Sequence, residues 1–133
     1  MLGLDLQVSD PPVPLASTEY IHWSGCIALS GQWRGAVTVS YPEPLARLAT
    51  SAMFAMEAAE VTDAEIQDAT GEIANLIGGQ TKQVLGDACF LGLPVVIKGD
   101  HFEATVPHSH TVVTLHFCCE NHPVDVAIVG ADS

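Results

Sequence analysis

The spacing of hydrophobic and polar residues changes along the chain, and each change marks a different predicted element. Residues 21–29 and 33–41 are rich in strand-forming side chains, and the second run alternates apolar residues with smaller or polar ones. Ser30-Gly31-Gln32 is a short connection containing glycine, so these two runs predict a β-hairpin. The alternation indicates a sheet that is packed on one face.

The spacing becomes helical after Pro42 and Pro44. Apolar residues from Leu45 to Met56 recur at helical intervals and predict a short amphipathic helix. A longer helix is predicted over residues 62–86, because Thr62-Asp-Ala-Glu65 has the spacing of a capping box. Its apolar residues lie on one side, namely Ile66, Ala69, Ile73, Leu76, Ile77 and Val84. A neighbouring stripe consists of Asp68, Glu72, Asn75, Gly79 and Lys82.

After Gly86 the alternation returns to period two and predicts four more strands, over residues 89–97, 101–106, 111–118 and 124–129. Pro94 lies inside the first of these runs, which indicates an edge position, a bulge or a late strand start. The predicted order is β-β-α-α-β-β-β-β. It indicates an α+β fold with an antiparallel sheet and helices packed on one face.

The first 20 residues contain Pro11, Pro12 and Pro14, which predict an extended or irregular lead-in. We expect residues 21–133 to form a single domain. The chain has neither a run of about 18 apolar residues nor the features of a signal peptide, so we expect a cytoplasmic protein.

Charge narrows the classes of partner. Four Lys/Arg against 16 Asp/Glu gives 4 − 16 = −12. A chain with this charge cannot replace the counterions of a phosphate backbone, which argues against a nucleic-acid partner. It also disfavours anionic membrane surfaces and favours partners that present lysine or arginine.

The last third of the chain carries possible metal ligands, which are His108, His110, His116, Cys118, Cys119 and His122. Paired CxxC spacing is absent, and on a strand His116 and Cys118 would share one face while Cys119 faces the other. We therefore favour ordinary histidines and reduced thiols over a metal site.

Two possible nucleophiles are equally weak candidates. Ser109 lies between two histidines and Cys89 follows Asp87, but neither lies in a recognisable triad or nucleophile elbow. A glycine-rich loop for binding phosphate is also lacking, because Gly78 and Gly79 lie within a helix.

The middle of the long helix is unusual. Asn75 is a poor helix former, and Gly78 and Gly79 each cost about 1 kcal/mol relative to alanine. The simplest explanation of Glu72 and Asn75 is the exposed side of an amphipathic helix. The alternative is a surface that a partner approaches closely, which would offset the cost of the glycines.

Asp68-Ala-Thr-Gly-Glu72-Ile-Ala-Asn75 resembles the signature of the CheC/CheX/FliY family of chemotaxis phosphatases, which is Asp or Ser, three residues, Glu, two residues and Asn. The resemblance is strongest to the CheX branch. It extends to the hairpin over residues 25–41, the short helix after it, and the segment 91–99.

The resemblance implies a phosphatase that hydrolyses the aspartyl phosphate of a CheY-like response regulator. Asn75 would orient the attacking water, and Glu72 would pair with the regulator lysine that contacts the phosphoryl group. Mg²⁺ would be bound by the regulator, and this chain would need no cofactor of its own. Asp68, Gly78, Gly79 and Lys82 would serve in docking.

The chain also departs from the family pattern. Family members usually begin with a full helix, and residues 1–6 resemble only its end, so we expect a domain boundary or a second chain that covers the exposed apolar surface. A homodimer fits the latter, because CheX-like proteins are commonly dimers. Only one copy of the signature is present, and Pro94 comes earlier than the family's proline. Two alternatives stay open, a non-catalytic module docking a regulator or flagellar protein, and a metal or thiol sensor.

Overall fold

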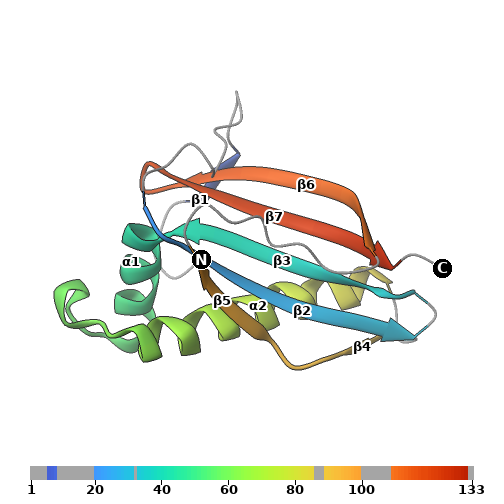
Figure 1. Ribbon diagram of the computed structural model, residues 1–133, viewed down its shortest axis with the longest axis horizontal. Helices are drawn as coiled ribbons and strands as arrows, with labels where there is room; N and C mark the ends of the chain where they lie inside the picture. Colours follow the sequence, from blue (N-terminus) through green and yellow to red (C-terminus); the bar gives the residue numbers. More distant parts are fainter. Residues whose placement is uncertain (1–5, 9–19, 32, 86–88, 100–108, 132–133) are drawn as a thin grey trace.

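The computed structural model describes residues 6–8, 20–31, 33–85, 89–99 and 109–131, which form a seven-stranded sheet with two α-helices on one face (Figure 1). All strand pairings among them are antiparallel. The strand order is β1-β6-β7-β3-β2-β4, and β5 also pairs with β2. The predicted α+β fold, with an antiparallel sheet and helices on one face, is therefore confirmed.

The strands comprise β1 (Leu6–Val8), β2 (His22–Gly31), β3 (Gly35–Pro42), β4 (Cys89–Leu91), β5 (Val95–Gly99), β6 (Ser109–Cys119) and β7 (His122–Ala131). The predicted hairpin is β2 and β3, in a register that pairs Trp23 with Tyr41. Glu120 (φ 49°) and Asn121 (φ 64°) connect β6 to β7. Positive φ at both residues suits a two-residue turn between twisted strands.

Both predicted helices are present, as α1 (Glu43–Phe54) and α2 (Asp63–Leu85), with a short 3₁₀ helix (Ala58–Glu60) between them. The capping box is confirmed at the start of α2. The Thr62 amide donates to Glu65 Oε1 at 3.0 Å, and the Glu65 amide donates to Thr62 Oγ1 at 3.3 Å. These bonds satisfy backbone donors that have no partner within the helix.

Two parts of the sheet differ from the prediction by more than a shift of one or two residues at the end of an element. The strand predicted over residues 89–97 is divided into β4 and β5, and β5 begins directly after Pro94, which is the late start that a proline favours. In the described part of the predicted lead-in, residues 6–8 form a short strand, β1, which pairs with β6. The strand predicted over residues 101–106 lies outside the described residues.

The helices approach the sheet most closely at two glycines. A Cβ on Gly25 of β2 would lie 2.9 Å from Ala74 Cβ, and one on Gly78 of α2 would lie 2.6 Å from Ile27 Cγ2. Both distances are shorter than real Cβ atoms make. The glycine in α2 therefore permits close packing of helix on sheet, which offsets its cost in helix propensity.

This packing turns part of the predicted apolar stripe away from the core. Leu76 is 50% exposed and Val84 is 86% exposed, so these two residues of the predicted apolar stripe do not pack in the core. Thr70 and Ala74 are buried instead. The reason is that contact follows the line of small residues through Ala74 and Gly78, which rotates Leu76 outward.

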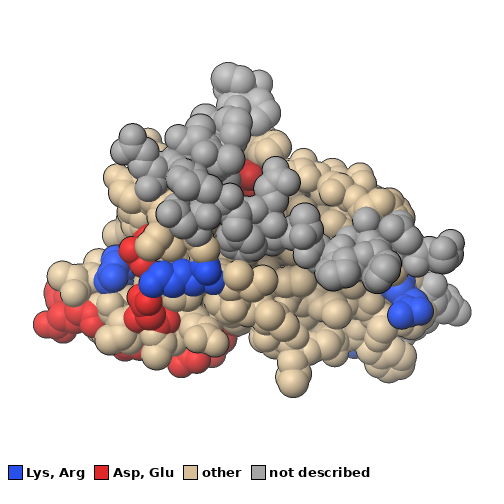
Figure 2. Space-filling model, viewed as in Figure 1, with Lys and Arg blue, Asp and Glu red and all other residues tan. Residues whose placement is uncertain are grey.

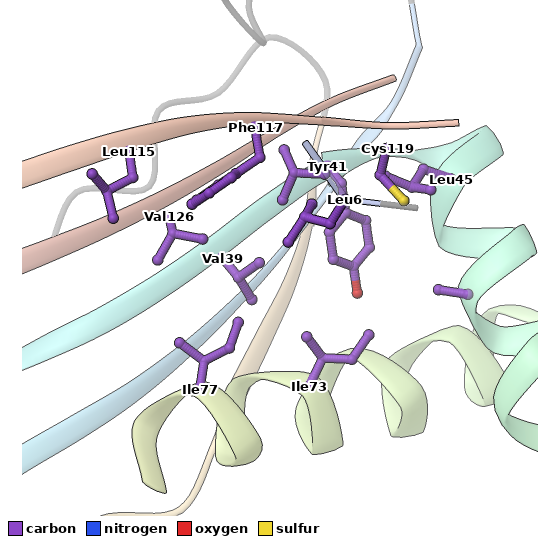
Figure 3. A pocket seen from close by; sticks show the side chains of 12 residues that line it. Leu6, Val39, Tyr41, Leu45, Ile73, Ile77, Leu115, Phe117, Cys119 and Val126 are labelled. Atoms are coloured by element: carbon purple, nitrogen blue, oxygen red, sulfur yellow. The ribbon is translucent and has the colours of Figure 1, made fainter. Parts of the chain in front are cut away.

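The helices pack mainly against β2 and β3, and they leave the other half of this face partly open. An apolar hollow of about 260 Å³ lies there, and Figure 3 shows Ile73 and Ile77 of α2 pointing towards it from below. Leu6 and Leu115, which also line it, are exposed. Among the described helices, none is long and apolar enough to cross a membrane.

Candidate functional site

A second hollow, of about 460 Å³, lies beside α2, between the end of α1 and β5. Three of the predicted site residues line it, namely Asp68, Glu72 and Asn75. The other lining residues are Phe54, Gln67, Gly71, Pro94 and Val96. The signature residues therefore lie together, bordered by the end of α1 and by β5.

The contacts of α2 with the sheet determine which of its side chains face this hollow. Tyr41 Oη donates a buried hydrogen bond of 2.7 Å to Thr70 Oγ1. At the next residue, Gly71, a Cβ would lie 3.7 Å from both Pro94 Cγ and Val96 Cγ2, so the helix backbone runs close to β5. With Thr70 held towards the sheet, Glu72 and Asn75 project outward, one helical turn apart.

The polar side chains of the hollow have no partners in the described part of the chain. Asp68, Glu72 and Asn75 are exposed, and their side chains make no hydrogen bond or ion pair with another described residue. They are therefore free to bind groups from another molecule. Two carboxylates beside a carboxamide favour a cationic group together with a hydrogen-bonding ligand.

Two cations of the neighbouring elements are engaged elsewhere. Lys98 Nζ lies 2.5 Å from Asp63 Oδ2, and this hydrogen bond raises the pKa of Lys98. Arg47 Nη1 donates to the Val61 carbonyl at 2.8 Å. Figure 2 shows Asp and Glu gathered at the end of the molecule where α1 and the start of α2 lie, with Lys and Arg beside them.

The remaining predicted docking residues do not line the hollow. Gly78 is buried against Ile27 of the sheet, whereas a Cβ on Gly79 would meet nothing within 4 Å. Lys82 is partly buried in the last turn of α2. Of these three, only Gly79 leaves a bare surface beside the signature residues.

Five residues that line the hollow were not among the predicted site residues, namely Phe54, Gln67, Gly71, Pro94 and Val96. Gly71 lies within the signature, between Asp68 and Glu72. Phe54 and Val96 carry no local signal, because only the packing of α1 and β5 against α2 brings them to the hollow.

The histidine-rich end of the chain forms no metal centre among the described residues, where no three His, Cys, Asp or Glu side chains converge. His116 Nδ1 lies 2.7 Å from Asp125 Oδ1. The predicted division of faces is confirmed, because Cys119 lines the apolar hollow and its neighbour Cys118 does not. The four cysteines are thiols that form no disulfide with one another, and His108 lies outside the described residues.

Neither candidate nucleophile is close to the hollow lined by the signature. Cys89 is buried, and its Sγ donates to the Trp33 carbonyl at 3.8 Å. Ser109 begins β6, which pairs with β7 and β1 in the other half of the sheet.

A family model described as chemotaxis phosphatase CheX matches residues 23–118 of the chain. Among solved structures, the chemotaxis protein CheX of Vibrio vulnificus is similar, with 24% identity and a TM-score of 0.75 over 96% of this chain and 84% of that one. CheX of Desulfovibrio desulfuricans has 22% identity and a TM-score of 0.71, over 96% of this chain and 87% of that one.

A third similar structure is the CheX-CheY-BeF3-Mg²⁺ complex of Borrelia burgdorferi. The identity is 19% and the TM-score 0.66, over 90% of this chain and 80% of that one. At these identities the structures establish a shared fold. A search of curated proteins finds no match.

Proposed function

Because the chain belongs to the chemotaxis phosphatase CheX family, we propose that it hydrolyses the aspartyl phosphate of a CheY-like response regulator. The observation that carries the proposal is the grouping of Glu72 and Asn75 on the exposed side of α2, without partners in the described chain. The Borrelia burgdorferi complex, in which a CheX protein is bound to CheY, supports the choice of partner. A cytoplasmic location is part of the proposal.

Asn75 would provide the catalytic hydrogen bonds. Its carboxamide oxygen accepts a hydrogen bond from a water molecule, and its NH₂ group donates one to a phosphoryl oxygen. The water attacks phosphorus in line, and the bond between phosphorus and the aspartate oxygen breaks. Inorganic phosphate and the free carboxylate result. Positioning of the water is sufficient, because an acyl phosphate is already activated.

Glu72 would hold the two proteins in register. Its carboxylate pairs with the regulator lysine that contacts the phosphoryl group, and Asp68 adds negative charge one turn earlier on α2. Mg²⁺ would be bound by the regulator, where it neutralises charge on the phosphoryl oxygens. Gly79 would let the regulator approach the helix, because no side chain stands there.

The proposal is tested by the lifetime of the phosphorylated regulator, with the wild-type protein and with Asn75→Ala and Glu72→Ala. The wild-type protein should shorten this lifetime, and Asn75→Ala should remove most of the effect while retaining binding. Removing one well-placed hydrogen-bonding group typically lowers a rate by about 10² to 10³. Binding without any effect on the lifetime would identify a non-catalytic docking module instead.

We also propose that the protein is a homodimer. The uncovered half of the sheet supports this, because Leu6 and Leu115 line the apolar hollow and are exposed, and Val8 of the same strand as Leu6 is exposed too. A second copy that packs there would remove this apolar surface from water.

A further inference from the structure

We propose that Phe54 is a docking residue of the phosphatase site. Together with Pro94 and Val96, it would receive an apolar side chain that the regulator carries next to the lysine bound by Glu72. The inference rests on the proposed function, because it assigns a second contact to the same partner.

Phe54 is held on the surface by the end of α1. It is the last residue of the helix, and Ala55 after it has a left-handed conformation (φ 52°) that ends α1. The turn is closed by a 3.2 Å hydrogen bond from the Met56 amide to the Ser51 carbonyl and by a second bond from Ser51 Oγ to the Met56 carbonyl. This turn fixes the position from which the aromatic ring projects.

Phe54 differs from the methionines near it in whether the side chain packs against the core. Met53 and Met56 pack against the main hydrophobic core, whereas Phe54 belongs to neither core cluster and is 39% exposed. It lines the hollow that contains Glu72 and Asn75. The ring therefore contributes apolar surface to the site rather than to the hydrophobic core.

The hollow has an apolar side and a polar side. Phe54, Pro94 and Val96 form the apolar side, and Asp68, Glu72 and Asn75 lie on the polar side. Gly71, which lines the same hollow, has no side chain to fill the space between them. A volume of about 460 Å³ lies within the range of sites that bury small molecules, so it can hold one large side chain.

Charge selects the occupant. The segment between Arg47 and Lys82 contains no other Lys or Arg, and its carboxylates are Glu57, Glu60, Asp63, Glu65, Asp68 and Glu72. A second copy of this chain, with a net charge of −12, would be repelled here. The complementary surface is an apolar side chain beside a lysine, on another protein.

An aromatic side chain in this position is expected to carry much of the affinity. Binding energy at interfaces is concentrated in a few residues near the centre, with aromatic residues prominent among them. The contact with Phe54 would form before and after hydrolysis alike, so it should affect binding much more than the chemical step.

The test uses the full chain and its regulator, with Mg²⁺ and beryllofluoride as the phosphoryl mimic. Phe54→Ala should weaken binding by about tenfold and raise the regulator concentration for half-maximal rate by a similar factor, with a much smaller effect on the maximal rate. Phe54→Leu should restore most of the affinity. Leu48→Ala is the matched control, since Leu48 is also on α1, is 37% exposed and does not line the hollow.

The outcomes separate this inference from the proposed function. Equal affinities of the wild-type protein and Phe54→Ala, with phosphatase activity present, would overturn the inference alone. Binding that depends on Phe54 without any hydrolysis would support the inference and overturn catalysis. Failure of the wild-type protein to bind would overturn both.

A measurement on the wild-type protein covers the case in which Phe54→Ala does not fold. With a methyl-labelled regulator, nuclear Overhauser effects should appear between the Phe54 ring and regulator methyl groups in the complex. Their absence, while contacts to α2 are observed, would also overturn the inference.

Discussion

Tyr41 and Thr70 join the sheet to α2 through a buried hydrogen bond, in which Tyr41 Oη donates to Thr70 Oγ1 at 2.7 Å. Both side chains are buried, and Thr70 is followed directly by Gly71 and Glu72. The bond therefore fixes the rotation of α2 about its own axis. It does so next to Gly71 and Glu72, which line the hollow of the site. Stability and the placement of Glu72 are linked through this contact.

Tyr41→Phe should lower the free energy of unfolding by about 1 to 3 kcal/mol, because it leaves the buried Thr70 hydroxyl without its donor. Urea unfolding measures the effect. The double variant with Thr70→Val should recover part of the loss, since both polar partners are then removed. An unchanged unfolding midpoint for Tyr41→Phe would show that the bond contributes nothing.

The same tyrosine predicts a change of stability at high pH. Burial raises the pKa of Tyr41 from 10.0 to about 12. The pKa of Tyr41 is higher in the folded protein than in the unfolded one. Its contribution to the free energy of unfolding is therefore fully present below pH 10 and is lost as the pH rises towards 12. The difference in unfolding free energy between the wild-type protein and Tyr41→Phe should therefore shrink across this range. A constant difference from pH 9 to pH 12 would contradict it.

The adjacent glycines of α2 should respond in opposite ways to alanine. Gly78→Ala should destabilise the protein, because the new Cβ would lie 2.6 Å from Ile27 Cγ2. Gly79→Ala meets nothing within 4 Å and should stabilise it by up to about 1 kcal/mol through helix propensity. Thermal unfolding compares the two variants directly. Shifts of the same sign would mean that α2 does not pack on the sheet in this register.

Dimerisation is tested by a charge on the uncovered half of the sheet. Leu115→Glu should convert the proposed dimer to a monomer of about 14.0 kDa in analytical ultracentrifugation. Thr114→Glu is the matched control, because Thr114 lies next to it on β6 but faces the other side of the sheet. A wild-type protein that sediments as a monomer would reject the dimer.

Elements whose signals lie close together in the sequence could be predicted. The capping box of Thr62 and Glu65 involves residues three apart, and the hairpin of β2 and β3 follows from alternation and a short turn. The grouping of Asp68, Glu72 and Asn75 needed only the period of a helix. These features depend on local geometry, so a tertiary context was not required.

The features that the sequence alone did not reveal depend on contacts between distant segments. Leu76 has helical spacing with the core residues, but the close approach at Gly78 turns it outward, and nothing in the helix alone reveals that rotation. Phe54 reaches the hollow through the packing of α1 beside α2, and Pro94 reaches it through the position of β5. Such relationships become visible only when the sheet is assembled.

Pro94 has a further consequence for the edge of the sheet. Phe90, Leu93, Val95 and Ile97 are exposed on or between β4 and β5, which would make an uninterrupted strand there prone to pair with another chain. Proline provides no amide donor, and it divides this edge into strands of three and five residues. The proline that borders the hollow of Glu72 and Asn75 therefore also keeps the exposed strands at this edge short, which disfavours their pairing with another chain.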